Sequence, residues 1–269
     1  MTTRILICDD SALARKQMAR ALPEGLRGDV SFAKDGVEAL EKLRRHEAEL
    51  MFLDLNMPEM DGYQVLEQVR KEELPVMTIV VSGDIQPEAR ERVKKLGALD
   101  FIKKPTETCI VLDLLVEYGL YRPCELEDSA LNDSSLKSTG STAPEISVSL
   151  NDYLQEISNV AMGRSSDLLA RLLRVFVKQP IPKVAFLANS ELHMAISSIS
   201  NSDTYSAVCQ GFTGAGIAGE ALLLFADASF RDMAEMLHYE NLEGEAVNVE
   251  VLMDMSSILF GAFLKGIGD

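Results

Sequence analysis

The sequence has few basic side chains. It holds 26 Lys and Arg against 42 Asp and Glu, which gives a formal net charge of −16. Residues 122–269 contribute 9 basic and 20 acidic side chains, a net −11. A DNA-binding output domain presents a basic face that neutralises phosphates. The acidic second half therefore argues against a nucleic-acid partner.

Long apolar runs and paired cysteines are also missing. No apolar run approaches the ~20 residues that cross a bilayer, and Met1–Arg4 leads straight into a strand-like segment without space for a signal peptide. The cysteines lie far apart, with no CxxC pair, at Cys8, Cys109, Cys124 and Cys209. These absences predict a cytoplasmic chain with reduced thiols and no membrane partner.

What the first 120 residues do have is an alternation of short apolar runs and amphipathic segments. The apolar runs predict strands near 4–8, 29–33, 50–54, 77–82 and 99–102. The amphipathic segments predict helices near 11–21, 36–46, 62–72, 87–96 and 106–119. Five such units indicate an α/β domain over 1–121, with a doubly wound parallel five-stranded sheet covered by helices on both faces.

Chemically active side chains follow four of the predicted strands. Asp9 and Asp10 follow the first strand and Asp54 ends the third, while Ser82 and Lys104 follow the later ones. In an open α/β sheet, ligands collect at the carboxyl ends of the strands. Three acids, a hydroxyl and a lysine at that edge predict a site for a divalent metal and a phosphoryl group.

These motifs, in this order, resemble the receiver domains of two-component systems, of the CheY type. The resemblance implies that Asp54 accepts a phosphoryl group from a histidine kinase and forms an aspartyl phosphate. It implies that Mg²⁺ is held by Asp9, Asp10, Asp54 and the backbone carbonyl of Asn56. Lys104 and Ser82 would contact the phosphoryl group. Phe101 stands at the family's aromatic switch position; the alternative is a plain core residue.

The remainder of the chain reads as a linker and a second domain. Residues 122–148 are rich in Ser, Thr, Asp and Glu and predict a flexible linker. The domain at 149–269 should be α+β, with a long helix at 150–178 capped by Ser149 or Asn151. Further elements are expected near 183–188 (strand), 190–199 (helix), 204–213 with 217–226 (hairpin around Gly214–Gly216, with a buried 220–225), 228–239 and 246–266 (helices).

One motif on the long helix is of interest. Asp152, Glu156 and Asn159 are spaced to share a helix face, with Pro182 further on. On most helices such a stripe is the solvated side. The pattern resembles the CheC/CheX/FliY family of chemotaxis phosphatases, which implies that Asn159 orients a hydrolytic water and Glu156 contacts the lysine of a phosphorylated receiver. Burial of this face in the folded protein would argue against the hypothesis.

An echo of the motif near the end of the sequence is degenerate. Asp254 stands in place of Glu and Ser257 in place of Asn, with Gly261 matching Gly163. Serine is too short to position the same water, so we expect a weakened second site. The family's fold continues with strands after this point. Either the sequence is truncated or another subunit, as in a homodimer, covers an open sheet edge.

The leading hypothesis is a response regulator whose CheC-like domain is an aspartyl-phosphate phosphatase. Its substrate would be a phosphorylated CheY-like receiver, in chemotaxis-type signalling. The alternative is a non-catalytic adaptor that only binds a partner under the control of receiver phosphorylation. The residues leave open the cognate kinase, hydrolysis in cis or in trans, and whether phosphorylation of Asp54 activates or inhibits.

Overall fold

The computed structural model describes residues 3–121, 148–188, 190–192, 194, 205–214, 217–239 and 244–268. The chain divides into two units. The first unit comprises Met1–Ser82 and Ala89–Glu156, and the second comprises Gly83–Glu88 and Ile157–Asp269. The boundary falls inside helix α6 (Leu150–Leu173), so Glu156 belongs to the first unit and Asn159 to the second.

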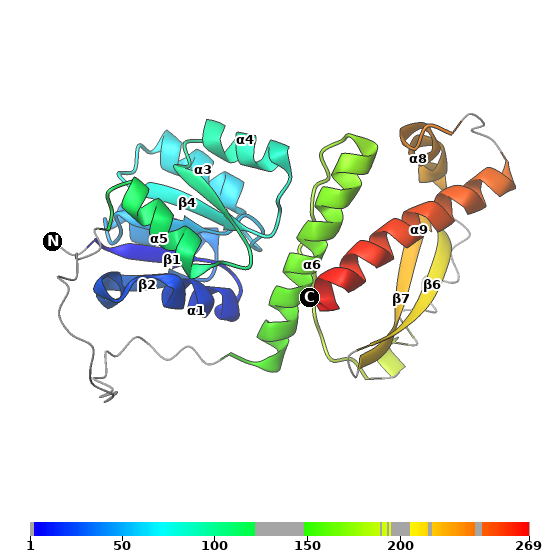
Figure 1. The fold of residues 1–269 in the computed structure, drawn as a ribbon, viewed down its shortest axis with the longest axis horizontal. Helices are drawn as coiled ribbons and strands as arrows, with labels where there is room; N and C mark the ends of the chain where they lie inside the picture. The colour runs from blue at the N-terminus through cyan, green and yellow to red at the C-terminus, as the bar shows by residue number, and fades with distance from the viewer. Residues whose placement is uncertain are drawn as a thin grey trace, which may run out of the picture. The chain divides into compact units, whose positions relative to one another are not determined.

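The first unit is built on a five-stranded parallel sheet, which confirms the prediction (Figure 1). Its strands are β1 (Ile5–Cys8), β2 (Val30–Ala33), β3 (Leu50–Leu53), β4 (Met77–Ser82) and β5 (Asp100–Lys103). They lie in the order β2-β1-β3-β4-β5, so the chain winds outward from β1 in both directions. This order places the ends of β1 and β3 side by side, with Cys8 level with Leu53.

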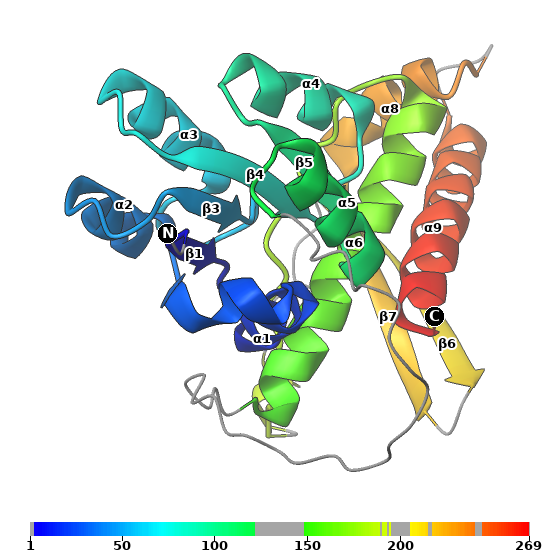
Figure 2. The same cartoon turned by 60° about the vertical axis from the view of Figure 1, so that its left-hand side comes forward.

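Helices cover both faces of this sheet (Figure 2). They are α1 (Ala12–Ala21), α2 (Gly36–Arg44), α3 (Gly62–Lys71), α4 (Pro87–Lys95) and α5 (Thr108–Glu117), with a 3₁₀ turn at Glu24–Asp29. Because successive strand residues point to opposite faces, Leu6 packs with residues of α2, α3 and α4, whereas Ile5 packs with residues of α1 and α5. Two apolar cores therefore fix the sheet that carries the polar strand ends.

The second unit contains an antiparallel hairpin and helices. β6 (Tyr205–Gly214) pairs with β7 (Ile217–Ala226), and α8 (Phe230–Met236) and α9 (Glu245–Gly268) follow. A 3₁₀ turn, Asp227–Ser229, joins the hairpin to α8. The core of this unit is formed by one face of these elements and the end of α6, at Leu173, Phe225, Phe230, Ala234, Val247, Val251 and Met255.

Helix α6 begins where the sequence predicts and ends earlier. The Ser149 hydroxyl accepts a hydrogen bond from the Asp152 N–H (3.1 Å), and the Asp152 carboxylate accepts one from the Ser149 N–H (2.9 Å), so Ser149 caps the helix. The predicted end at 178 is wrong. Arg174 adopts φ 55° and the Val175 N–H bonds back to the Ala170 carbonyl, the geometry of a Schellman ending.

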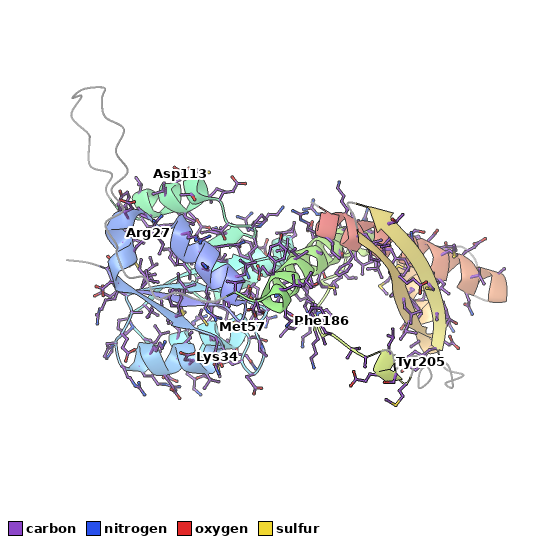
Figure 3. The ribbon with its side chains drawn as sticks, turned by 90° about the horizontal axis from the view of Figure 1, so that it is seen from below. Arg27, Lys34, Met57, Asp113, Phe186 and Tyr205 are labelled. Carbon is purple, nitrogen blue, oxygen red and sulfur yellow. The ribbon has the colours of Figure 1, made fainter. Side chains whose placement is uncertain are left out.

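Two further expectations for the second unit are corrected. Residues 183–188 form no strand and pair with no other strand among the described residues; Phe186 there is 73% exposed (Figure 3). Residues 220–225 are not uniformly buried, because only one face of the hairpin packs on the core: Phe225 is buried while Leu222 and Leu224 are exposed. The predicted linker at 122–147, most of the helix at 190–199 and the turn at 215–216 lie outside the described residues.

Helix α9 contains a longer apolar segment than expected from the sequence. Within the described residues it is the one helix, over Ala246–Ile267, whose length and mean hydropathy of 1.5 would suffice to cross a membrane. The same helix buries Val251 and Met255 completely in the core of the second unit. The core helix of a soluble domain also has a buried face of this kind. Length and composition therefore do not distinguish a core helix from a membrane-spanning one.

Candidate functional site

Two buried carboxylates meet at the carboxyl edge of the sheet. Asp9 follows β1 and Asp54 follows β3, and each is nearly inaccessible to solvent. Backbone N–H groups hold both in place: Ser11 donates to Asp9 Oδ1 (2.8 Å) and Asn56 donates to Asp54 Oδ2 (3.2 Å). With Asp10, these carboxylates place one oxygen each within 4.8 Å of one another.

A close backbone approach sets the position of Asp54. The Gly62 N–H donates to the Leu55 carbonyl (3.0 Å), and a Cβ at Gly62 would overlap the Asp54 carbonyl. Only glycine fits between the start of α3 and the end of β3. The Asp-Gly sequence at 61–62 therefore serves both helix start and site, because the Asp61 side chain also caps α3 in a capping box with Gln64.

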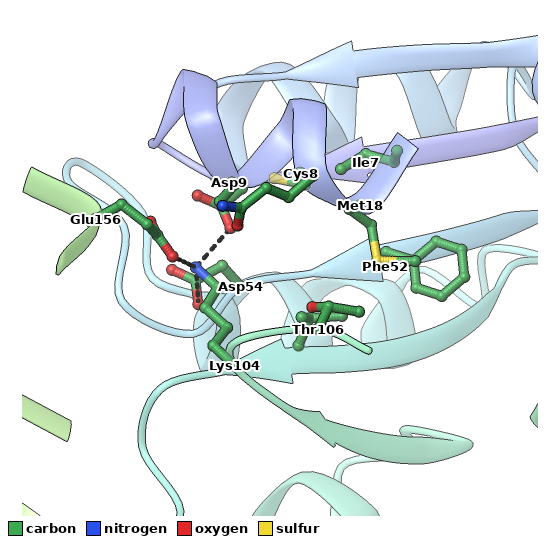
Figure 4. Close-up of a pocket in the computed structure, with 12 residues that line it drawn as sticks. Ile7, Cys8, Asp9, Met18, Phe52, Asp54, Lys104, Thr106 and Glu156 are labelled. Carbon is green, nitrogen blue, oxygen red and sulfur yellow. Dashed lines mark ion pairs between the residues drawn. The ribbon is translucent and has the colours of Figure 1, made fainter. Parts of the chain in front are cut away.

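Lys104 joins three carboxylates (Figure 4). Its ammonium nitrogen lies 2.7 Å from Asp9 Oδ2, 3.4 Å from Asp54 Oδ1 and 3.4 Å from Glu156 Oε1. All four side chains are buried. The structure thus brings the predicted receiver residues together and adds Glu156 of α6 to the same cluster.

The electrostatics reflect an excess of acidic side chains in a buried site. Burial, with the charges of neighbouring carboxylates and against the charge of Lys104, raises the pKa of Asp9 to about 7 and of Asp10 and Asp54 to about 6. Burial by itself would lower the pKa of Lys104, but the carboxylates of Asp54, Asp9 and Glu156 raise it well above its usual value. The cluster therefore favours a further cation.

A divalent metal fits this cluster. Asp10 Oδ1 is buried and has no hydrogen-bond partner among the described residues. Carboxylate oxygens in this number are the ligands that hard cations such as Mg²⁺ and Ca²⁺ prefer. The three acids therefore suit a hard divalent cation, in agreement with the prediction from the strand ends.

The other predicted receiver residues lie at the expected strand positions. Ser82 ends β4 and is fully buried. Phe101 in β5 is buried in the core, with the Arg90 guanidinium 5.4 Å from the centre of its ring. That location is compatible with both roles foreseen for Phe101, and the switch role stays a prediction.

The motif on α6 is buried. Glu156 and Asn159 are each 5% exposed, so this face is not a solvated stripe. Glu156 Oε2 and both amide atoms of the Asn159 side chain have no hydrogen-bond partner within the part of the chain that the structure describes. The Asn159 main-chain carbonyl accepts from Gln179 Nε2 (3.3 Å). Asp152, by contrast, is occupied as part of the helix cap.

The degenerate copy on α9 has an ordinary structural environment. Asp254 is exposed and accepts a hydrogen bond from the Tyr239 hydroxyl (2.7 Å), which raises the pKa of Tyr239 to about 12. Ser257 is exposed as well. Neither residue has the burial that marks Glu156 and Asn159, so the second site remains a prediction without structural support.

Sequence reasoning missed two residues near the site. Thr106 lines the pocket beside Lys104 and Asp54, and the Arg15 guanidinium donates to the main-chain carbonyls of Asp9 (2.6 Å) and Asp10 (3.2 Å). Thr106 lies two residues after Lys104, and this position close to a predicted site residue could have indicated that it lines the site. Arg15 was hidden because an arginine on an amphipathic helix normally faces solvent.

Comparisons with known proteins match the first unit. Residues 5–114 fit the family model of the response regulator receiver domain. A protein-glutamate methylesterase/protein-glutamine glutaminase of Archaeoglobus fulgidus is 34% identical over 116 residues, which cover 42% of this chain and 33% of that protein. A response regulatory protein of Staphylococcus epidermidis is 29% identical over 155 residues, 56% of this chain and 59% of its own length.

Among solved structures, the signal receiver domain of the response regulator NarL from Mycobacterium tuberculosis is similar. It is 31% identical, with a TM-score of 0.40, and the match covers 45% of this chain and 98% of that domain. The chain spans between a third and three fifths of the length of the two curated relatives described above. The sequence match, the parallel sheet and the acidic pocket agree: the N-terminal part of this chain is a response regulator receiver domain.

Proposed function

We propose that this chain is a response regulator that is phosphorylated on Asp54 and whose helix α6 carries an aspartyl-phosphate phosphatase pair, Glu156 and Asn159. The observation that supports it most is the ion pair between Glu156 Oε1 and Lys104 Nζ, 3.4 Å apart. A receiver-type lysine is the group that the resemblance assigns to this glutamate.

Phosphorylation would proceed at the buried carboxylate of Asp54. One of its oxygens attacks the phosphorus of a histidine kinase's phosphohistidine, and the bond from phosphorus to the imidazole nitrogen breaks. Lys104, already paired with Asp54, offsets the charge of the transferring group. Asp9, Asp10, Asp54 and the Asn56 carbonyl would hold Mg²⁺, which neutralises phosphoryl oxygens when bound. Ser82 would donate to a phosphoryl oxygen.

Hydrolysis would use water to remove the phosphoryl group from the aspartate of a CheY-like receiver. An amide both donates and accepts hydrogen bonds, so Asn159 can hold a water in line with the phosphorus atom. Glu156 keeps Lys104 oriented toward the phosphoryl group. The water oxygen forms a bond to phosphorus, and the bond from phosphorus to the aspartate oxygen of the receiver breaks with its electron pair returning to the carboxylate. One proton leaves to solvent.

The pair is buried in the folded chain. Glu156 and Asn159 are each 5% exposed. Burial of this face is the outcome that argues against the phosphatase hypothesis; the ion pair between Glu156 and a receiver lysine supports it.

The methylesterase relatives match this chain only over the length of a receiver domain. The Archaeoglobus match and another in Geobacter sulfurreducens extend over 116 and 120 residues and cover 33% and 32% of those proteins. Such lengths correspond to one receiver domain. The esterase activity in those names therefore belongs to proteins of which this chain matches about a third.

The test is release of inorganic phosphate with acetyl phosphate as donor, from the chain alone and with an added stand-alone CheY-type receiver. We expect Asn159→Ala to slow release by about 10-fold or more in at least one of the two assays, because a positioned polar group at a reacting centre contributes this much. Asn151→Ala, on the same helix, is the matched control and should match the wild type.

The adaptor alternative makes the opposite prediction. If Asn159→Ala and Glu156→Gln leave phosphate release unchanged in both assays while the variants stay folded, α6 does not catalyse hydrolysis. Glu156 would then serve only to bind a receiver lysine, without a role in hydrolysis.

A further inference from the structure

Arg15 of α1 binds the backbone of the turn that carries the two acids after β1. One guanidinium nitrogen, Nη1, donates to the main-chain carbonyl of Asp9 (2.6 Å) and to that of Asp10 (3.2 Å). All three residues belong to the first unit. A guanidinium is always charged, and a hydrogen bond from a charged donor is stronger than one between neutral groups. Arg15 therefore ties the peptide groups of both acids to the helix.

The two carboxylates of this turn are held to different degrees. Asp9 has a partner at each oxygen, since the Ser11 N–H donates to Oδ1 (2.8 Å) and Lys104 Nζ lies 2.7 Å from Oδ2. Asp10 Oδ1, by contrast, is buried and has no hydrogen-bond partner among the described residues. Buried polar groups are almost always hydrogen-bonded, so this oxygen calls for a partner, which a bound cation would supply.

The backbone of the turn is anchored on either side of Asp10. The Asp9 N–H donates to the Ala33 carbonyl (3.1 Å), which continues the pairing of β1 with β2. Ser11 caps α1 with its side chain. Arg15 binds the stretch between these two anchors. Because Asp10 Oδ1 has no partner to orient it, the position of this carboxylate depends on the backbone that Arg15 holds.

We infer that Arg15 is a positioning residue for a divalent-cation site at Asp9, Asp10 and Asp54, and that it acts mainly by fixing the backbone of Asp10. The inference rests on the metal-binding part of the proposed function. Both hydrogen bonds from the guanidinium go to main-chain carbonyls, so they restrict where the carboxylates lie without occupying carboxylate oxygens. Groups that orient metal ligands in this way typically change metal affinity by about 10–100-fold when they are removed.

The experiment measures the dissociation constant of the full chain for Mg²⁺ by titration calorimetry. We expect Arg15→Met to weaken binding by about 10-fold or more. Arg20→Met is the matched control, because Arg20 is exposed on the same helix and carries the same charge; its constant should equal that of the wild type. Arg15→Lys keeps the charge on a shorter side chain. It should give an intermediate constant, and it carries the test if Arg15→Met does not fold.

Two further readouts separate positioning from a general loss of structure. In an Asp10→Asn background, Arg15→Met should weaken Mg²⁺ binding by much less than it does in the wild type, because the carboxylate that it positions is gone. Labelling of Asp54 by acetyl phosphate should need more Mg²⁺ to reach its half-maximal rate in Arg15→Met. The maximal rate at saturating Mg²⁺ should stay close to that of the wild type.

The outcomes for the inference and for the proposed function are distinct. Equal dissociation constants for Arg15→Met and Arg20→Met would overturn the inference and leave the proposed function standing. An equal loss from Arg15→Met with and without Asp10→Asn would do the same. Absence of Mg²⁺ binding by the wild type would overturn both. A wild type that binds Mg²⁺ but is never labelled on Asp54 would overturn the proposed function alone.

Discussion

At the scale of single residues, the site has too many acids for its cations. Lys104 is paired with three carboxylates, and Asp10 adds a fourth acid to the cluster. A buried acid whose pKa is raised is a charge that the folded state holds at a cost. A bound divalent cation would offset the negative charge and relieve that cost. The free energy of unfolding should therefore increase when the cation binds.

This excess predicts that Asp10→Asn stabilises the metal-free chain. The pKa of Asp10 is about 6 in the folded state against 3.8 for the unfolded chain, so the folded state binds the additional proton between those values. The free energy of unfolding therefore increases as pH falls from about 7 to about 4. At pH 8 the ionised Asp10 carboxylate lowers the free energy of unfolding by its full amount. We expect the variant to gain about 2–5 °C in melting temperature at pH 8 with EDTA.

Two controls make this result specific. Asp113 on α5 is exposed, so Asp113→Asn should leave the melting temperature unchanged. Added Mg²⁺ should raise the melting temperature of the wild type more than that of Asp10→Asn, and the gain from the substitution should shrink at pH 5. A lower melting temperature for Asp10→Asn at pH 8 without metal would contradict the argument.

Some residues of the site could be predicted from the sequence and others could not. Asp54 and Lys104 were predictable because Asp54 directly follows an apolar run and Lys104 comes two residues after one, and register in a parallel sheet brings such positions together. The contact of Glu156 with Lys104 in the same chain was not, because no local pattern encodes a tertiary ion pair. Asp152 resembled part of a functional stripe, yet its carboxylate is occupied at the helix cap.

At the scale of elements, Gly163 and Gly261 form a natural comparison on α6 and α9. A Cβ at Gly163 would overlap the carbonyl of Gly83, whereas a Cβ at Gly261 meets nothing within 4 Å. Alanine is the better helix former by about 1 kcal/mol where space allows. Gly261→Ala should therefore raise the melting temperature slightly, while Gly163→Ala should lower it by several degrees because of the overlap.

The measurement is a pair of thermal melts under one condition. Equal shifts of the same sign for Gly163→Ala and Gly261→Ala would show that helix propensity alone governs both positions. Opposite shifts would show that close approach of α6 to the Gly83 backbone requires a glycine.

The elements differ in how well the sequence predicted them. The strands of the first unit were predictable within about two residues, because buried parallel strands are continuous apolar runs. The end of α6 was not, since the left-handed Arg174 gives no composition signal. The run at 220–225 resembled a fully buried strand, but a two-stranded sheet packs one face, which leaves Leu222 exposed.

At the scale of the whole molecule, charge is uneven. Residues 122–269 carry 20 acidic and 9 basic side chains, and the chain as a whole has a net charge of −16. Like charges on one compact chain repel each other, and this repulsion opposes the folded state. Exposed ion pairs such as Arg44–Glu72 (2.6 Å) and Arg4–Glu49 (3.2 Å) act in the other direction but contribute about 0–1 kcal/mol each.

Because the repulsion extends over the molecule and each exposed pair contributes little, screening should stabilise the protein. We expect the apparent melting temperature at pH 7.5, with EDTA present, to rise by a few degrees between about 20 mM and about 300 mM NaCl, as the Debye length falls from about 20 Å to about 6 Å. KCl should act equally, since the effect is not ion-specific. A falling melting temperature would mean that surface ion pairs outweigh the net charge, and that the acidic surface is already locally compensated.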